Sequence, residues 1–416
     1  MWKLTKVAAV AAALAAAVAA HAGEVEVLHY WTSGGEAKSA AELKKMMQAK
    51  GHTWRDFAVA GGGGDSAMTV LKSRVISGNP PSAAQVNGPA IQEWASEGVL
   101  GNMDALAKSE KWDEALPKVV ADVMKYKGNY VAAPVNVHRV NWIWASSDAL
   151  KKAGVAAMPK TWDEFFAAAD KLKAAGLIPV AHGGQNWQDF TTFESVVLGV
   201  GGPKFYQDAL VKLDDKALTS DTMKKSLETF RRIKTYTDPG APGRDWNLAT
   251  AMLIQGKAGF QLMGDWAKGE FIAAGKAPGK DFMCAAAPGT ANAFTFNVDS
   301  FILFKLKDAA AQKAQSDLAS AIMSPGFQEV FNLNKGSIPV RAGQSMDKFD
   351  DCAKASAKDF ADTAKSGGLV PSVAHGMAIA PATEGAIKDA VSQFWNDDKV
   401  SVADAMKKIA TAAKTK

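Results

Sequence analysis

The regular alternation of short apolar runs with longer helical patterns constrains the fold more than any other feature of this sequence. An apolar run beginning at Glu24 precedes a helical pattern over 36–50, and a second run over 53–60 precedes another over 66–76. Runs with period two favour strands, and the longer patterns between them favour helices. Strands that alternate with helices in this way are typical of doubly wound α/β sheets.

The length of the chain and three extended segments predict two lobes rather than one. The 416 residues exceed what a single hydrophobic core usually supports. Extended stretches over 130–135, 294–304 and 334–341 interrupt the alternation, and we interpret each as a segment that crosses between lobes. The sequence therefore predicts two α/β lobes joined by hinge crossovers.

The first 22 residues have the pattern of a secretory signal peptide. Lys3 and Lys6 form a positive start, residues 7–20 are a continuous run of mostly Ala and Val, and residues 20–22 fit the small-x-small cleavage rule. The alternative is a membrane anchor, but the run is shorter than the roughly 20 residues that span a bilayer. We therefore expect cleavage near Gly23 and an exported, periplasmic protein.

Charge and cysteine content argue against nucleic acids and metal ions as ligands. Removal of Lys3 and Lys6 lowers the formal net charge from +5 to +3, and no basic stretch is dense enough to follow the phosphates of a nucleic acid. Cys284 and Cys352 are the only cysteines, and two distant cysteines with few histidines do not favour a metal site. In an exported protein, one disulfide between them is the simplest arrangement.

Tyr30, Trp31 and Glu36 lie where the first predicted strand passes into a turn and then into a helix. In an open parallel sheet, ligands bind just beyond the carboxyl ends of the strands. Two adjacent aromatic rings and a carboxylate at such an end offer a ligand an apolar face and a charged acceptor. The alternative is that Trp31 lies in the core and that Glu36 stabilises the helix start through the helix dipole.

Four consecutive glycines, Gly61 to Gly64, follow the second predicted strand. The run lacks the ending and the spacing of phosphate-binding loops, so a phosphate site is not favoured. Glycine instead allows the backbone to approach a ligand or a neighbouring helix closely. We expect Asp65 to cap the helix that follows, with contact to the ligand as the alternative.

Aromatic and polar residues also lie on or just beyond strands predicted farther along the chain. Trp266 comes just after the apolar run 258–263, in the predicted second lobe. Asn297 and Asp299 lie on the crossover stretch 294–304, and such side chains are rarely buried without partners. We expect both to face a polar cleft; the alternative is that they bond to local backbone groups.

Five local motifs occur in the order found in the solute-binding proteins of ABC sugar importers, and together they cover nearly the whole mature chain. The sequence therefore resembles this family, extracellular solute-binding protein family 1. Within it, residues 31–36, 61–64 and 135–142 and the surroundings of Lys335 and His375 are most similar to the periplasmic glucose-binding proteins of Gram-negative bacteria. The five motifs are Val-Leu-His-Tyr-Trp at 27–31 and the stretches 126–134, 159–165, 255–266 and 336–341.

The resemblance implies a fold and a division into lobes. The fold would be the α/β, two-lobed periplasmic-binding-protein fold, with each lobe a doubly wound sheet with helices on both faces. Residues 1–22 would be the signal peptide, 23–134 and 298–338 the N-terminal lobe, and 135–297 and 339–416 the C-terminal lobe. Sugar would bind between the lobes, and a membrane permease with its ATPase would accept the closed complex.

The resemblance also implies a set of sugar-binding residues. Two of them depart from the pattern of the glucose-binding proteins, since Tyr30 stands where a second Trp is expected and Asn87 stands where Lys is expected. Tyr still stacks on a sugar, whereas the loss of a cationic donor at Asn87 bears on affinity and on the choice between epimers. The implied set is Tyr30, Trp31, Glu36, Asn87, Trp266, Asn297, Asp299, Lys335 and His375.

We predict a monomeric periplasmic protein without a cofactor that delivers a monosaccharide, glucose, to an ABC permease. A maltose-type di- or oligosaccharide is the alternative ligand, and Trp187 and Gln188 would then line or block an extended site. A glycosidase is the alternative class, with Glu36 and either Asp299 or Asp265 as its carboxylates. No nucleophile elbow, metal motif or dinucleotide fingerprint supports an enzyme. The sequence is silent on a chemoreceptor as a second partner.

Overall fold

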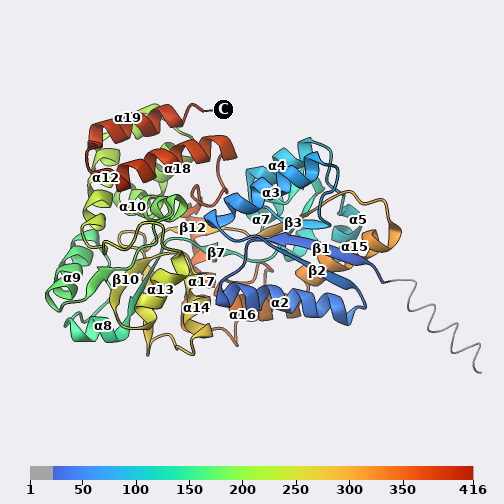
Figure 1. Cartoon of the computed structure of the whole chain (residues 1–416), viewed down its shortest axis with the longest axis horizontal. Coiled ribbons are helices and arrows are strands. Elements are labelled where there is room, and N and C mark those ends of the chain that lie inside the picture. The colour runs from blue at the N-terminus through green and yellow to red at the C-terminus, as the bar shows by residue number, and fades with distance from the viewer. Residues whose placement is uncertain (1–21, 416) are drawn as a thin grey trace, which may run out of the picture.

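The structure of the protein is a computed structural model that describes residues 22–415 (Figure 1). The predicted signal peptide, up to residue 21, lies outside the described residues. The chain forms two α/β lobes side by side, which confirms the predicted fold class (Figure 1). Within residues 22–415, no helix combines the length and the apolar character that crossing a membrane requires.

The N-terminal lobe is built on a five-stranded sheet. Its strands, in spatial order, are β2 (Thr53–Ala58), β1 (Glu24–His29), β3 (Ala83–Gln85), β13 (Ser300–Leu303) and β6 (Ala132–Pro134). β1 pairs in parallel with β2 and β3, whereas β13 runs antiparallel to β3 and β6. Because β1 has a neighbour on each side and helices over both faces, Val25, Val27 and Leu28 are fully buried.

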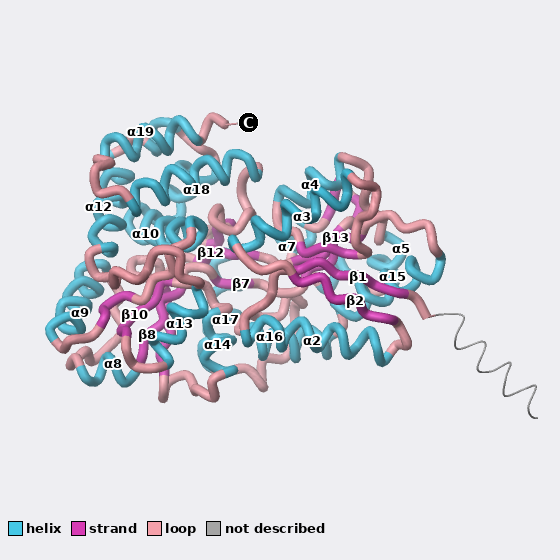
Figure 2. Tube along the Cα trace, viewed as in Figure 1, coloured by secondary structure: helices cyan, strands magenta, loops and turns pink. Residues whose placement is uncertain are grey.

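Helices lie on both sides of this sheet (Figure 2). On one side, α2 (Gly34–Ala49), α15 (Ala309–Met323) and α16 (Pro325–Lys335) pack together, and on the other lie α3 (Asp65–Ile76) and α4 (Pro89–Ser96). The remaining short elements are η1 (Gly62–Gly64), α5 (Asp104–Ser109), α6 (Trp112–Ala115), α7 (Lys118–Val123), β4 (Lys125–Tyr126) and β5 (Asn129–Tyr130).

The start of α3 differs from the prediction. Gly64, with φ of 111°, occupies the cap position, and Asp65 is already the first helical residue and makes no side-chain cap. The glycine run extends in the left-handed region up to the helix, so the cap falls on the residue that adopts a positive φ most easily. The Asp65 carboxylate instead lines the cavity between the lobes and lies 3.8 Å from Lys388 Nζ.

The C-terminal lobe is built on a four-stranded sheet. Its strands, in spatial order, are β11 (Phe282–Ala286), β8 (Trp142–Ser146), β10 (Ala258–Leu262) and β9 (Ile178–Val180). Its helices are α8 (Ser147–Lys152), α9 (Trp162–Ala174), α10 (Asn186–Tyr206), η2 (Gln207–Val211), α11 (Asp215–Leu218), α12 (Asp221–Lys234), α13 (Trp246–Ile254), α14 (Ala267–Ala273), α18 (Pro381–Asn396) and α19 (Val402–Ala412). α10 is buried along most of its length, and its buried residues include the carboxylates Asp189 and Glu194.

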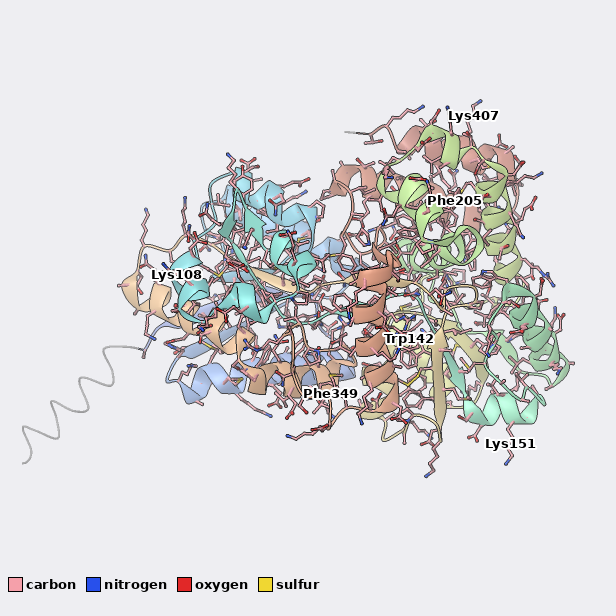
Figure 3. All side chains as sticks on the ribbon, turned by 180° about the vertical axis from the view of Figure 1, so that it is seen from behind. Lys108, Trp142, Lys151, Phe205, Phe349 and Lys407 are labelled. Atoms are coloured by element: carbon pink, nitrogen blue, oxygen red, sulfur yellow. A yellow bond between two sulfur atoms is a disulfide. The ribbon has the colours of Figure 1, made fainter. Side chains whose placement is uncertain are left out.

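A small three-stranded sheet joins the two lobes. Its strands, in spatial order, are β14 (Leu369–Pro371), β12 (Phe294–Asn297) and β7 (His138–Arg139), and Figure 1 places β7 and β12 between the two larger sheets. On the back of the molecule, α17 (Asp351–Ser366) runs along this boundary, with Phe349 near its start (Figure 3). A disulfide between Cys284 on β11 and Cys352 on α17 confirms the predicted bond.

The stretch 294–304 was predicted as one crossover strand, and it forms two strands in two different sheets. The chain leaves β12 after Asn297 and enters β13 at Ser300. Backbone hydrogen bonds tie the crossovers together, since Val137 and Ile338 exchange bonds of 2.9 and 3.1 Å. The predicted lobe boundaries remain a prediction; Val340 and Phe349, beyond residue 338, pack into the core of the N-terminal lobe.

Candidate functional site

A cavity of about 740 Å³ lies between the two lobes. Its walls come from the carboxyl ends of β1 and β3, the glycine run, the start of α10, the residues after β10 and the turn after β14. The structure brings all nine residues of the predicted set to this cavity: Tyr30, Trp31, Glu36, Asn87, Trp266, Asn297, Asp299, Lys335 and His375.

Tyr30 and Trp31, which follow β1, form the aromatic wall of the N-terminal lobe. Trp31 is only 2% exposed and packs edge-on against Phe301, so most of its ring belongs to the core. The Tyr30 ring lies against Gly64, where an added Cβ would stand 3.0 Å from the ring. Burial and the nearby Asp299 carboxylate raise the pKa of Tyr30 well above its usual value, so its hydroxyl stays protonated.

Trp266, His375 and Trp187 form the opposite wall. The Trp266 ring centroid lies 4.8 Å from that of His375 and 6.4 Å from that of Trp187. Trp187 stands at the start of α10, and its indole N–H donates to Gln185 Oε1 at 2.7 Å. The cavity therefore has an aromatic wall from each lobe.

Glu36 and Lys335 form an ion pair at the cavity, with 2.7 Å between Oε1 and Nζ. The Lys335 Nζ lies 6.0 Å from the ring centroids of both Trp31 and Trp266, so the cation stands between the two aromatic walls. Glu36 Oε2 also accepts from the backbone N–H of Ser33 at 3.4 Å. Glu36 therefore both accepts a backbone hydrogen bond at the start of α2 and lines the cavity.

Four polar side chains surround the carboxylate of Asp299. The amide nitrogens of Gln85 and Asn87 lie 3.3 Å from Oδ1, and Asn136 Nδ2 and His138 Nε2 lie 3.1 and 2.9 Å from Oδ2. Asp299 is 3% exposed. A carboxylate held by several donors keeps its charge and its orientation even when it is buried.

Asn87 stands where the resemblance predicts Lys. Its amide nitrogen lies 3.2 Å from Asn297 Oδ1 and 3.4 Å from the Tyr30 hydroxyl. With the amide turned by 180°, the nitrogen instead donates to the carbonyl groups of Val86 and Val298 at 3.2 Å. In both orientations Asn87 brings a neutral amide, and no second cation, to the carboxylate side of the cavity.

His138 bridges two carboxylates and was missing from the predicted set. Its Nε2 faces Asp299, and its Nδ1 forms a short hydrogen bond to Asp265. Burial acts to lower the pKa of His138, but the two carboxylates outweigh burial and raise it. Burial likewise acts to raise the pKa of Asp299, yet His138, Lys335 and Asn136 hold that pKa well below its usual range. His138 therefore supports the charged form of Asp299, which lines the cavity.

His375 is a neutral imidazole in this site. Burial, with smaller contributions from Lys388 and His138, lowers its pKa to about 3. Its Nε2 lies 3.0 Å from Thr191 Oγ1, and the Thr191 hydroxyl donates to the Trp187 carbonyl at 2.8 Å. Since that hydroxyl proton is already engaged, Nε2–H donates to Thr191 and Nδ1 is the acceptor of the ring.

Of the residues named for the alternative ligand and the alternative enzyme class, some line the cavity and others do not. Trp187 lines the cavity, whereas Gln188 is fully buried and donates to a backbone carbonyl at 3.0 Å. Asp265 faces His138 and is not part of the cavity wall, so it cannot act there as a carboxylate paired with Glu36. In the sequence, His138 lies within the stretch 135–142 that resembles the glucose-binding proteins, just beyond the predicted crossover 130–135.

Two α/β lobes joined by crossovers, with a cavity lined from both lobes, form an arrangement suited to enclosing a small ligand. The family model of the bacterial extracellular solute-binding proteins matches residues 31–320. The chain is 49% identical over 399 residues to a probable sugar-binding periplasmic protein of Rhizobium meliloti, covering 96% of each chain. It is 48% identical over 420 residues to one of Brucella suis, covering 99% of each.

The chain belongs to the bacterial extracellular solute-binding proteins, a family of binding proteins rather than enzymes. A glucose-binding protein of Saccharolobus solfataricus is 25% identical over 255 residues, 58% of this chain and 45% of the other. Among solved structures, a chitin oligosaccharide binding protein has a TM-score of 0.80 at 18% identity, covering 94% and 98% of the two chains. A solute receptor described as preferring β-D-galactopyranose has a TM-score of 0.77 at 19% identity, covering 94% and 98%.

Proposed function

We propose that this protein captures a monosaccharide, most specifically glucose, in the periplasm and delivers it to the permease of an ABC importer. The observation that carries the proposal is the composition of one cavity, in which an aromatic wall from each lobe faces a rim of paired charges. A pyranose ring has apolar C–H faces and a rim of hydroxyl groups, and the cavity offers a partner for each.

The aromatic walls would cover the two faces of the sugar ring. Burial of C–H groups against Tyr30 or Trp31 on one side and Trp266 on the other is favourable in proportion to the apolar area removed from water. The charged groups would bind the rim, since Glu36 and Asp299 accept from hydroxyls, Lys335 donates, and His375 accepts through Nδ1.

Choice between epimers would follow from unpaired polar groups. An epimer with one hydroxyl reversed leaves one acceptor or donor of the site buried without a partner. That loss costs about 1–3 kcal/mol for a neutral group and more for a charged one. Because Asn87 supplies an amide where Lys is expected, its contribution to this selectivity is weaker than that of a cation.

The proposed location and partners follow from the family and from the N-terminal sequence. Residues 1–22 act as a cleavable signal peptide, and the mature protein works in the periplasm as a monomer. The closed, sugar-loaded form is what the permease accepts, and a chemoreceptor that recognises the same form is a further candidate partner.

An oligosaccharide of the maltose type is the second candidate ligand. The observation that favours it is the extent of the cavity, whose wall continues past the nine residues to Trp187, Trp246 and Asn247. Aromatic side chains at that end could stack on a second sugar ring. Relatives of the same fold include proteins named for chitin oligosaccharide and for β-D-galactopyranose, so the fold accommodates ligands of both lengths.

The test is an isothermal titration of ligand-stripped mature protein with glucose, galactose, mannose and maltose. We expect one-to-one binding of glucose, weaker binding of the epimers and little heat with maltose. Asp299→Asn should weaken glucose binding, whereas the matched control Asp317→Asn, on α15 beside His52, should not. Heat with maltose alone would replace glucose by the second candidate, and no heat with any sugar would overturn both.

A further inference from the structure

The turn that carries His375 into the cavity is held by one carboxylate from the interior of the C-terminal lobe. Glu194, on α10, accepts from the Ser372 hydroxyl at 2.6 Å through Oε1. Its Oε2 accepts from the backbone N–H groups of Val373 at 2.9 Å and Ala374 at 3.1 Å. Glu194 therefore engages each of the three residues that precede His375.

Glu194 is itself fixed by its surroundings. It is fully buried, and the Tyr206 hydroxyl, at the far end of α10, lies 2.8 Å from its Oε2 and 3.0 Å from the Pro371 carbonyl. One turn earlier on the same helix, Thr191 contacts the ring of His375. The helix thus holds both the backbone of the turn and the imidazole that the turn presents.

Filling this space with a buried carboxylate costs free energy of folding. Burial raises the pKa of Glu194 to about 7 even though four hydrogen-bond donors act to lower it. An apolar side chain would pack α10 against the turn without that cost, but it would leave the Ala374 N–H without its acceptor and the Val373 N–H with only the Tyr206 hydroxyl, at 3.3 Å. The carboxylate therefore stabilises one specific conformation of the turn.

We propose that Glu194 is a positioning residue of the ligand site, which clamps Ser372 to Ala374 and thereby sets the place and the hydrogen-bonding state of His375. Glu194 does not reach the cavity, so it acts only through the turn. The consequence for function rests on the proposed sugar site: the clamp fixes which sugar hydroxyl His375 can accept from, and so contributes to the choice between epimers.

Glu194→Gln keeps the shape of the side chain and replaces one acceptor oxygen with a donor group, which faces donors in the turn. At a pH above the Glu194 pKa of about 7, where the native side chain is an ionised acceptor, we expect the glucose dissociation constant of the variant to rise about fivefold to thirtyfold and its preference for glucose over epimers to shrink. Asp189→Asn is the matched control, because Asp189 is a fully buried carboxylate on α10 that bonds to His182 and Ser392 instead of the turn. Its sugar binding should remain within about twofold of that of the native protein.

A double-mutant cycle separates positioning from general destabilisation. If Glu194 acts through His375, Glu194→Gln should cost no further affinity in a protein that already carries His375→Ala. Equal losses in both backgrounds would overturn the proposal. If Glu194→Gln does not fold, Ser372→Ala removes a single hydrogen bond to the carboxylate and takes its place in the same cycle.

The imidazole NMR signals of His375 in the sugar-free protein test the clamp without any ligand. We expect Glu194→Gln to change the nitrogen shifts that report the Nε2–H tautomer and Asp189→Asn to leave them unchanged. Unchanged shifts in both variants would overturn the clamp. If the native protein binds none of the sugars, the proposed function fails, and the NMR comparison still decides whether Glu194 positions His375.

Discussion

At the scale of single residues, the charges of the cavity are paired with one another before a ligand arrives. Lys335 faces Glu36 at 2.7 Å, and His138 faces Asp299 at 2.9 Å. Pairing fixes the direction of each group, so little reorganisation remains for the moment of binding. A ligand would then form its hydrogen bonds with side chains whose positions are already fixed by these ion pairs.

Trp266→Ala should remove the aromatic wall of the C-terminal lobe. We expect glucose affinity to fall by at least about 2 kcal/mol, because a central aromatic residue in a desolvated site typically carries that much of the binding energy. Calorimetric titration measures the loss. The control is Trp94→Ala, which removes a Trp that packs against Phe304 outside the cavity and should leave binding unchanged. Unchanged binding in Trp266→Ala would take this residue out of the site.

Glu194 predicts a dependence of stability on pH. Its pKa is about 7 in the folded protein against an ordinary value of 4.5, so the folded state holds a proton that the unfolded state has lost between these pH values. The contribution of Glu194 to the free energy of unfolding should therefore fall by about 3 kcal/mol as pH rises from 4.5 to 7. Tyr206 is the titratable group that contacts it.

Urea unfolding of the native protein and of Glu194→Gln at several pH values measures this term. The free energy of unfolding of the native protein, relative to that of the variant, should decrease across the interval. Parallel curves for the two proteins would show that Glu194 is ionised throughout and that its donors outweigh burial.

The sequence predicted the residues whose position depends on local pattern. Trp266 could be found because an aromatic just beyond a strand marks a ligand end of a sheet. His138 and Glu194 could not be found that way, because their roles depend on partners far along the chain, Asp299 and the turn before His375. Asp65 was misassigned as a cap because the left-handed conformation of Gly64 is not visible in composition.

At the scale of elements, one of the predicted hinge crossovers is a place where the chain changes sheets. β12 belongs to the small sheet between the lobes and β13 to the N-terminal lobe, with only Val298 and Asp299 between them. Polar and apolar residues alternate through β12 and then pass without interruption into the apolar run of β13, so the sequence predicts one strand where the backbone turns from one sheet to the next. Asp299, which lines the cavity, therefore lies on a predicted hinge crossover.

The disulfide between β11 and α17 should matter for stability and not for binding. Cys284 and Cys352 are 68 residues apart, and in the loop-entropy model a bridge over such a distance stabilises by about 4 kcal/mol. We expect the Cys284→Ala/Cys352→Ala double variant to unfold at lower urea concentration with unchanged sugar affinity, since neither residue lines the cavity. Thiols that react in denatured, unreduced native protein would contradict the bond.

At the scale of the whole molecule, the two lobes touch across the cavity. Asp65 lies 3.8 Å from Lys388, and the backbone N–H of Gly35 donates to Glu270 Oε1 at 2.9 Å. A sugar that contacts both walls stabilises this closed arrangement over any open one by its difference in affinity for the two. Sugar affinity therefore includes the free energy of contacts between the lobes that the sugar never touches.

Gly63 provides a direct test of that coupling. A Cβ at this position would stand 2.9 Å from Trp187 Cγ in the other lobe, whereas a Cβ at Gly62 would meet only the side chain of Asp65 in its own lobe, at 3.1 Å. Both glycines have nearly the same positive φ, 60° and 63°, so Ala strains the backbone equally at the two positions. Only Gly63→Ala should oppose closure.

We therefore expect Gly63→Ala and Gly62→Ala to lower the free energy of unfolding by similar amounts in the absence of sugar, about 1–2 kcal/mol each. Gly63→Ala should in addition bind glucose roughly tenfold more weakly than Gly62→Ala, because the clash with Trp187 exists only when the lobes meet. Small-angle scattering at saturating glucose should show a larger radius of gyration for Gly63→Ala. Equal affinities and equal radii would mean that the contact between Gly63 and Trp187 does not limit closure, and that the sugar-bound protein stops at a wider angle than the structure shows.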